Sequence, residues 1–384
     1  MRDRRGRAGG LAACALLVPF ASAQTTKPPE PPPAVDPYTR GEALALTRAG
    51  YQSYGPMRFG PSTSDLVQGH LGDVPILWVE TEHFRLGSSL NEYKPTKPQE
   101  LEELKQELTG LSDVLERVPA KAKKLDPWLR LHLFARRLEL LHAKFAERLA
   151  LGTLTKSGVR VPEPAMPEKQ LVLLTQKEST LARFTREYCG AERGDSFLHC
   201  FQDPKTLFFG ISDEAVGNGD AELHYAVVYG VTQNLLCGLG GYPHNLPTWW
   251  ANGLALWFAR ETRPRVMLYA RPAADLLPPD ELMDWQPLVR GRVAAGSYLS
   301  WNDMLARASW LEQPFGDNLV LWSRIDYLLQ REGLAGEIAL QMHLPVGTVP
   351  DGATALKAAT GLELDALDSA WKDWVLDTYR KKRK

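Results

Sequence analysis

Residues 221–261 read AELHYAVVYGVTQNLLCGLGGYPHNLPTWWANGLALWFARE, and this segment contains two apolar runs. Its first part is apolar at helical spacing, and Pro247 and Thr248 open a second apolar run that ends near Glu261. A segment rich in glycine and proline separates the two runs. Because glycine and proline interrupt regular structure, the stretch predicts a helix, a loop and a second helix.

The second predicted helix resembles the glutamate-bearing helix of gluzincin zinc metallopeptidases, which carries a PxWxxEGLAxxF-like run. Asn252 stands where that family has its glutamate. In the aminopeptidase type, eighteen residues separate the HExxH signature from this glutamate, which aligns the signature with residues 229–233, YGVTQ. The matching residues of the second helix are Pro247, Trp249, Gly253, Leu254, Ala255 and Phe258.

The resemblance extends over about residues 74–376. Three further segments are similar to parts of secreted bacterial gluzincin-like domains. They are a strand within residues 74–90, a pair of helices in residues 315–344, and terminal helices in residues 353–376 that contain Thr360, Gly361, Leu367, Trp371 and Trp374.

The resemblance implies a degenerate active site. Tyr229 and Gln233 occupy the two histidine positions, Gly230 the position of the general base, and Asn252 that of the third zinc ligand. A catalytic zinc of this class requires two imidazoles at i and i+4 and a carboxylate. A tyrosine with a pKa of about 10 stays protonated at neutral pH, and carboxamides carry no charge. Glycine has no side chain that accepts a proton. We therefore expect no catalytic residue, no metal and no other cofactor here.

Two non-catalytic roles fit such a scaffold. Tyr225, Tyr229 and Gln233 recur along one face of the first helix, and this face would line the former cleft opposite Trp249 and Asn252. The uncharged cleft could hold a peptide, a protein or a glycan without cutting it. In the second role, these bulky side chains fill the cleft, and the domain is structural or engages a partner elsewhere.

The alternative is an active hydrolase whose chemistry has moved. Cys237 and His244 are seven residues apart and could form a nucleophilic dyad if they lie within hydrogen-bonding reach. His224, Cys237 and His244 could also form a relocated metal site.

The N-terminal sequence predicts export. Several arginines precede an apolar stretch at residues 11–20, and Ala21, Ser22 and Ala23 form an A-x-A cleavage site, which together indicate a signal peptide over residues 1–23. The expected location is periplasmic or extracellular. Residues 11–14, LAAC, also fit a lipobox, so lipoprotein anchoring is the second interpretation. In an oxidising compartment, Cys189 and Cys200 could close the loop between them as a disulfide.

The remaining chain predicts one large domain of α+β class with a thermolysin- or gluzincin-like fold, in which a small N-terminal sheet precedes a mainly helical C-terminal half. Residues 24–40 are rich in proline and predict a linker. The domain is expected over residues 41–384, with a strand-containing half at 74–220, the former active-site helices at 221–261 and a helical half at 262–384. Individual predictions are a strand near residues 78–86, helices at 100–118 and 128–151, and strands at 170–175 and 205–212.

Charge and hydropathy narrow the range of partners. The formal net charge is −1, and the predicted signal peptide carries four of the arginines, so a nucleic-acid partner is not expected. No stretch after the N-terminal segment approaches the roughly 20 apolar residues that a membrane helix requires.

Overall fold

The computed structural model describes residues 32, 34–155, 158–164, 166–217, 219–239, 246–268, 283–307, 313–331, 333–342 and 351–380. All of them belong to one unit, Pro32–Lys384. The predicted signal peptide and most of the predicted linker lie outside the described residues. Among the described residues, no helix is long and apolar enough to cross a membrane.

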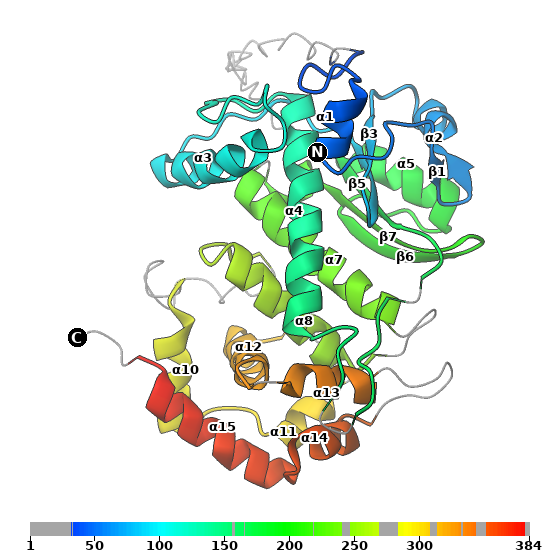
Figure 1. Cartoon of the computed structure of the whole chain (residues 1–384). Helices are drawn as coiled ribbons and strands as arrows, with labels where there is room; N and C mark the ends of the chain where they lie inside the picture. Colours follow the sequence, from blue (N-terminus) through cyan, green and yellow to red (C-terminus); the bar gives the residue numbers. More distant parts are fainter. Residues whose placement is uncertain are drawn as a thin grey trace, which may run out of the picture. The chain divides into compact units, whose positions relative to one another are not determined.

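A five-stranded sheet occupies the N-terminal half of this unit, in the order β3-β4-β5-β7-β6 (Figure 1). The pairs β4/β5 and β5/β7 are parallel, whereas the outer pairs β3/β4 and β6/β7 are antiparallel. Residues 58–63 form a separate small sheet of β1 (Arg58–Phe59) and β2 (Ser62–Thr63). The main strands are β3 (Leu77–Glu80), β4 (Phe84–Ser88), β5 (Gln170–Thr175), β6 (Ser196–Gln202) and β7 (Lys205–Ser212).

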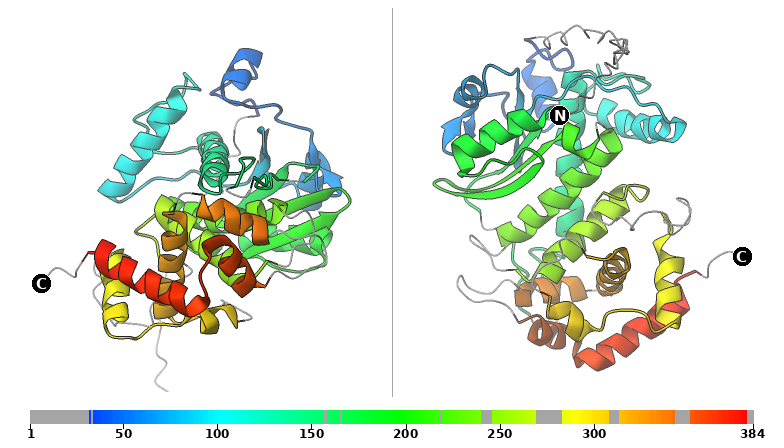
Figure 2. Two further views of the ribbon diagram at one scale, coloured as in Figure 1. Left: turned by 60° about the horizontal axis from the view of Figure 1, so that its bottom comes forward. Right: turned by 180° about the vertical axis from the view of Figure 1, so that it is seen from behind.

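Helices cover both faces of the sheet and form the C-terminal half (Figures 1 and 2). The N-terminal helices are α1 (Ala43–Arg48), α2 (Ser64–His70), α3 (Pro98–Ser112), α4 (Pro127–Arg148), α5 (Glu178–Cys189) and α6 (Asp213–Val216). The central pair is α7 (Asp220–Leu239) and α8 (Thr248–Thr262). The C-terminal helices are α10 (Trp285–Ala294), α11 (Trp301–Leu305), α12 (Phe315–Leu329), α13 (Leu334–Met342), α14 (Gly352–Thr360) and α15 (Leu364–Thr378).

The central strands are apolar on both sides because helices pack on both faces. Every residue of β5, QLVLLT, is buried, as expected of a strand in the parallel part of a sheet. Phe208 of β7 belongs to the cluster under α2 and α5, where it stacks on Phe184 at 4.8 Å. Its neighbour Phe209 belongs to the larger core formed with α4 and α7. The alternation along β7 thus divides the core into two layers.

The predicted α+β class is confirmed, and the strands predicted at 170–175 and 205–212 have the observed bounds of β5 and β7. The prediction of one strand near 78–86 is wrong, because β3 and β4 form a hairpin. Its turn is closed by the Thr81 N–H, which donates to the carbonyl of Phe84 at 2.9 Å. The helix predicted at 100–118 ends earlier, at Ser112. Helix α5 and strand β6 were not predicted.

The predicted linker is too long at its C-terminal end, because Asp36 and Thr39 are buried in the folded body. The Asp36 carboxylate accepts hydrogen bonds from His132 Nε2 at 3.1 Å and from the Tyr54 hydroxyl at 2.6 Å. Burial by itself would raise the pKa of Asp36, but hydrogen bonds from His132, Thr39 and Tyr54 outweigh it and hold the pKa well below the usual range. The chain is therefore anchored from residue 36 onward.

A buried ionic network joins α3, α4, α7 and the end of α8. Arg137 of α4 donates to both carboxylate oxygens of Asp220 at 3.0 and 2.6 Å, and their side chains are only 4% and 1% exposed. Arg137 also donates to Glu107 of α3 at 2.6 and 3.2 Å. Arg263, just after α8, donates to Glu107 at 3.1 Å and, through Nε, to His224 Nδ1 at 3.0 Å. We call Glu107, Arg137, Asp220, His224 and Arg263 the buried network.

A second buried cation organises the C-terminal helices. The Arg324 guanidinium of α12 lies over the rings of Trp301 and Trp371, 4.6 and 4.7 Å from their centroids. It also donates to the Leu299 carbonyl at 2.6 Å and forms an ion pair with Asp368 of α15. This one side chain therefore holds α11, α12 and α15 together.

Replacing Arg137 tests how strongly the buried network stabilises the fold. Arg137→Met keeps an apolar stem but leaves Asp220 buried without its main counter-charge, so we expect the free energy of unfolding to fall by about 3–5 kcal/mol. Urea denaturation followed by circular dichroism measures the change. The control is Arg186→Met, which breaks a pair with Glu192 whose side chains are both 62% exposed, and we expect less than about 1 kcal/mol there. Equal losses in the two variants would contradict a dominant role for the network.

The low pKa of Asp36 gives stability a defined pH dependence. A carboxyl whose pKa is lower in the folded state stabilises the fold above its unfolded pKa of about 4, and this contribution disappears as the pH falls. We expect Asp36→Asn to lower the free energy of unfolding by about 1–3 kcal/mol at pH 7 and by progressively less below pH 4. Denaturation of both proteins between pH 3 and pH 7 measures the difference. A difference that stays constant over this range would contradict the assignment.

Candidate functional site

The side chains of Tyr229, Gln233 and Asn252 converge at one point between α7 and α8. The Tyr229 hydroxyl donates to Asn252 Oδ1 at 3.1 Å, and Gln233 Nε2 donates to the same oxygen at 2.7 Å. Tyr229 and Gln233 lie one helical turn apart on α7 and so present their side chains on one face. We call these three residues the amide cluster. Its shared acceptor forms a direct polar link between the two helices.

Close packing positions the two helices. In α8, a Cβ atom at Gly253 would lie 2.7 Å from Cγ1 of Ile325, so α8 approaches α12 closely at this glycine. On its other side α8 packs along α7, and α7 in turn packs on β7. The amide cluster therefore lies on helices whose spacing is set by the core.

Gly230 is buried where α7 crosses β7. A Cβ atom at this position would lie 2.2 Å from Cε2 of Phe209. This distance is far shorter than a van der Waals contact between two carbon atoms. The phenyl ring therefore occupies the space that a side chain at position 230 would need. This contact explains a glycine inside a helix, where it costs about 1 kcal/mol relative to alanine. It also means that a glutamate at position 230 would require Phe209 to move.

Trp249 lies in the core and not on a surface open to a ligand. Its side chain is 2% exposed, and its ring packs edge-to-face on Trp301 with centroids 5.7 Å apart. The neighbouring Trp250 is fully buried, and Tyr225 on α7 is buried as well. The predicted aromatic wall of the cleft is thus part of the hydrophobic core, whereas Tyr229, Gln233 and Asn252 are partly exposed.

The structure describes two of the three residues of the alternative hydrolase sites. His224 is buried, and its Nδ1 accepts the hydrogen bond from Arg263. Burial, together with the charges of Arg137 and Arg263, lowers its pKa well below the usual value, so the ring is neutral. Cys237 is half-buried on α7, and His244 lies outside the described residues. Among described side chains, no group of three or more His, Cys, Asp or Glu is arranged to hold a metal ion.

The expected disulfide is not present in this structure. Cys189 ends α5 as a free thiol and packs against the apolar cluster between α5 and the sheet. Cys200 lies in β6, opposite Leu207 of β7. Burial raises the pKa of the Cys189 thiol to about 12, so the thiol stays protonated and unreactive at neutral pH.

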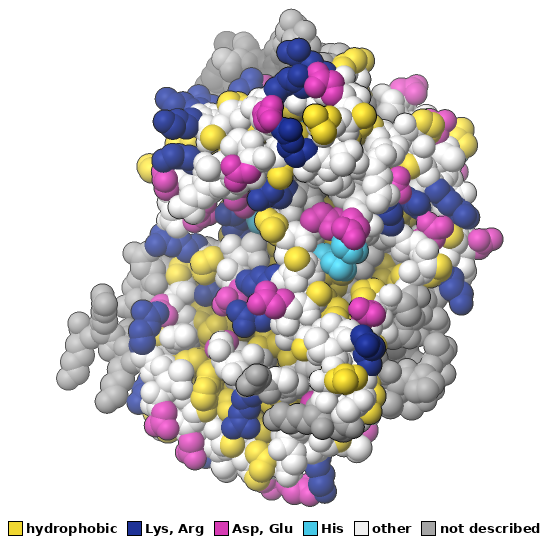
Figure 3. Space-filling view, in the orientation of Figure 1, with side chains coloured by type: hydrophobic (Ala, Val, Ile, Leu, Met, Phe, Trp, Pro, Cys, Tyr) yellow, Lys and Arg dark blue, Asp and Glu magenta, His cyan; other side chains and the backbone are white. Residues whose placement is uncertain are grey.

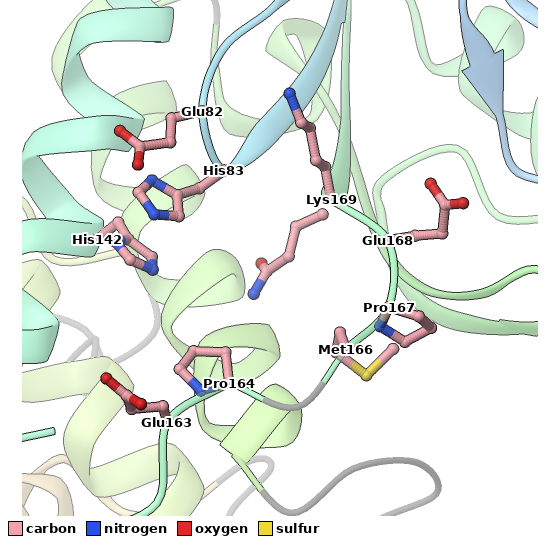
Figure 4. A pocket seen from close by; sticks show the side chains of 10 residues that line it. Glu82, His83, His142, Glu163, Pro164, Met166, Pro167, Glu168 and Lys169 are labelled. Atoms are coloured by element: carbon pink, nitrogen blue, oxygen red, sulfur yellow. The ribbon is translucent and has the colours of Figure 1, made fainter. Parts of the chain in front are cut away.

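Sequence reasoning did not identify a pocket of about 400 Å³ beside the β3–β4 turn (Figure 4). The rings of His83 and His142 stack there with centroids 3.6 Å apart. On the face of the molecule shown in Figure 3, histidine and acidic side chains lie next to each other near the middle. No local motif marks the pair, because one histidine follows a strand and the other lies in a distant helix. The lining residues are Glu82, His83, His142, Glu163, Pro164, Met166, Pro167, Glu168, Lys169 and Gln170.

The two histidines titrate differently. A hydrogen bond from His83 Nδ1 to Glu139 Oε2 at 2.7 Å raises the pKa of His83, although burial opposes this shift. Burial, followed by the charge of His83, lowers the pKa of His142 to about 4. The pKa values of the two stacked rings therefore shift in opposite directions, that of His83 upward and that of His142 downward.

No family model matches this chain, and no curated protein matches it.

Substituting Gly230 tests the close approach of α7 to β7. Because a methyl group would collide with Phe209, we expect Gly230→Ala to lower the free energy of unfolding by about 1–3 kcal/mol. Its matched control is Gly291→Ala in α10, where a Cβ atom would meet nothing within 4 Å, and alanine there is expected to stabilise by up to about 1 kcal/mol. Thermal and urea denaturation measure both variants. If Gly230→Ala also stabilises the protein, the steric explanation fails.

Proposed function

We propose that this chain is an exported gluzincin-like protein that has lost zinc-dependent hydrolysis and acts as a non-catalytic binding or structural protein. The observation that supports it best is the convergence of Tyr229, Gln233 and Asn252 on a single hydrogen-bonded point. These are the three positions that the gluzincin resemblance assigns to zinc ligands.

The convergence supports the resemblance because it depends on the number of residues between the positions on α7 and the position on α8. Side chains at i and i+4 of one helix share a face in any protein. A third side chain, from the next helix, meets them only when the two helices cross at a suitable angle and position. Asn252 meets this requirement, since its amide oxygen accepts from both Tyr229 and Gln233.

Chemistry at the cluster supports the loss of catalysis. All three side chains are neutral at physiological pH, and the general-base position is a glycine covered by Phe209. A phenol and two carboxamides offer no charge to offset a zinc ion. Each of them donates or accepts hydrogen bonds, and all three are partly exposed. Such a surface suits a peptide backbone or a glycan, and it also suits a purely structural link between α7 and α8.

The burial of Trp249 and Trp250 favours the structural role over a deep aromatic binding cleft. The alternative of an active hydrolase with a relocated metal site loses one of its three candidate ligands, because His224 accepts a hydrogen bond from Arg263 within the buried network. No observation favours the Cys237/His244 dyad.

Restoring the ligands tests the proposal. We expect the full chain carrying Tyr229→His, Gln233→His and Asn252→Glu together to retain one zinc ion through gel filtration, because two imidazoles and a carboxylate would then meet at one point. We expect no peptide hydrolysis, because Gly230 still supplies no general base. Elemental analysis and a broad peptide-cleavage assay measure both properties.

The control is the double variant that lacks Asn252→Glu, which is expected to retain less zinc. A folded triple variant that holds no more zinc than the unmodified chain would overturn the gluzincin-like geometry. Peptide cleavage by the unmodified chain that Cys237→Ala abolishes and Asn252→Ala leaves intact would establish the active-hydrolase alternative instead.

A further inference from the structure

The pocket at His83 and His142 has the composition of a metal site. Three segments surround it: the β3–β4 turn carrying His83, helix α4 carrying His142, and residues 163–164 and 166–170 before and at the start of β5. Figure 4 places the two imidazole rings on one wall and Met166, Pro167 and Glu168 on the wall opposite. None of these residues belongs to the amide cluster, so the pocket is a separate feature.

Glu139 fixes the orientation and the tautomer of His83. Its Oε1 accepts hydrogen bonds from the His83 backbone N–H at 3.0 Å and from the Thr81 hydroxyl at 2.5 Å. Its Oε2 is 2.7 Å from His83 Nδ1. A carboxylate that already accepts from two donors accepts from the imidazole as well, so Nδ1 carries the proton and a neutral ring keeps its lone pair on Nε2. Metal-ligating histidines almost always donate their other ring N–H to such a partner.

His142 stacks on His83 and packs edge-on against Phe84, with ring centroids 6.3 Å apart. Glu139 and His142 are at i and i+3 on α4, so the helix presents both on the same side. Within the described residues, neither ring nitrogen of His142 has a hydrogen-bond partner. Because no hydrogen bond fixes the ring, rotation about its soft terminal torsion, which opens the stack on His83, would direct a nitrogen toward His83 Nε2.

Gln170 supplies a second, independent indication of a ligand. Its side chain is 7% exposed and lines the pocket, yet its amide Oε1 is buried without a hydrogen-bond partner among the described residues. A buried carbonyl oxygen without a donor is unfavourable and rare in folded proteins. An ion, or a water molecule bound to an ion, would satisfy this oxygen. Glu82 and Glu163 add negative charge to the lining that attracts a cation, and the lysine of the lining, Lys169, is paired with Glu80 at 3.3 Å.

We propose that this pocket binds a divalent transition-metal ion through the imidazoles of His83 and His142, with Glu139 as a positioning residue. Imidazole is a preferred ligand of zinc, nickel and copper ions. Because the described chain holds no preassembled set of three His, Cys, Asp or Glu ligands, the ion keeps several water ligands and binds with micromolar affinity. The Gln170 carbonyl accepts a hydrogen bond from one of these waters.

Calorimetric titration of the chelator-treated full chain with Ni²⁺ and Zn²⁺ tests the proposal. We expect one micromolar site in the unmodified protein, no measurable site in His83→Gln or His142→Gln, and an affinity about 10–100-fold weaker in Glu139→Gln. The matched control is His70→Gln, which removes a histidine on α2 that bonds Tyr188 and should leave the affinity unchanged. Co²⁺ titration followed by visible absorption gives a second readout of imidazole ligation.

Two outcomes would overturn the proposal. One is the absence of a micromolar site in the unmodified chain, and the other is a site that persists in His142→Gln while circular dichroism shows the variant to be folded. Neither outcome affects the function proposed for the amide cluster, because that test uses Tyr229, Gln233 and Asn252 and measures zinc that survives gel filtration. Performing the ligand-restoration experiment in the His142→Gln background separates the two sites.

Discussion

The ion pair between Arg137 and Asp220 is the constraint on which the arrangement of the central helices depends. Two charges buried this deeply stabilise a fold only when they are paired closely, and here two hydrogen bonds join them. Burial alone would raise the pKa of Asp220, but the nearby charges of Arg137, Arg263 and Arg130 outweigh it and lower the pKa. Asp220 is also the first residue of α7, where a carboxylate is favoured by the helix dipole. The pair therefore fixes where α7 begins and how it lies against α4.

Once its first turn is fixed, the two sides of α7 make opposite kinds of contact. Toward the sheet, Gly230 lets the helix approach Phe209, and the contact is apolar. Toward α8, Tyr229 and Gln233 donate to Asn252. A carboxylate at position 252, partly buried and without a cation, would need a counter-charge that the described surroundings do not supply, whereas an amide accepts the same hydrogen bonds at a smaller desolvation cost. The neutral cluster thus links the two helices at a smaller desolvation cost than a carboxylate would.

The sequence predicted features that depend on neighbouring residues and missed features that depend on residues far apart in the chain. The apolar runs of β5 and β7 gave the correct bounds, and the spacing implied by the gluzincin resemblance singled out Tyr229, Gln233 and Asn252, which share hydrogen bonds in the structure. The β3–β4 turn was missed because it contains neither glycine nor proline, and edge strand β6 because it is mostly half-exposed. Arg137 and Asp220 are separated by 83 positions, so no pattern connects them. The disulfide was inferred from the compartment, which says nothing about whether two cysteines meet.

The distribution of ionisable groups along α7 follows from the same physics. Charge is concentrated at the first turn, where Asp220 meets Arg137, and the middle of the helix carries only neutral polar groups. Near the last turn, Nε2 of Gln170 would lie 3.9 Å from a Cβ atom at Gly238, which brings the lining of the histidine pocket next to the helix C-terminus. The carbonyl groups at that end of a helix carry partial negative charge and favour a nearby cation. A neutral centre and a cation-attracting end are therefore compatible on one helix, because the dipole acts only within the terminal turns.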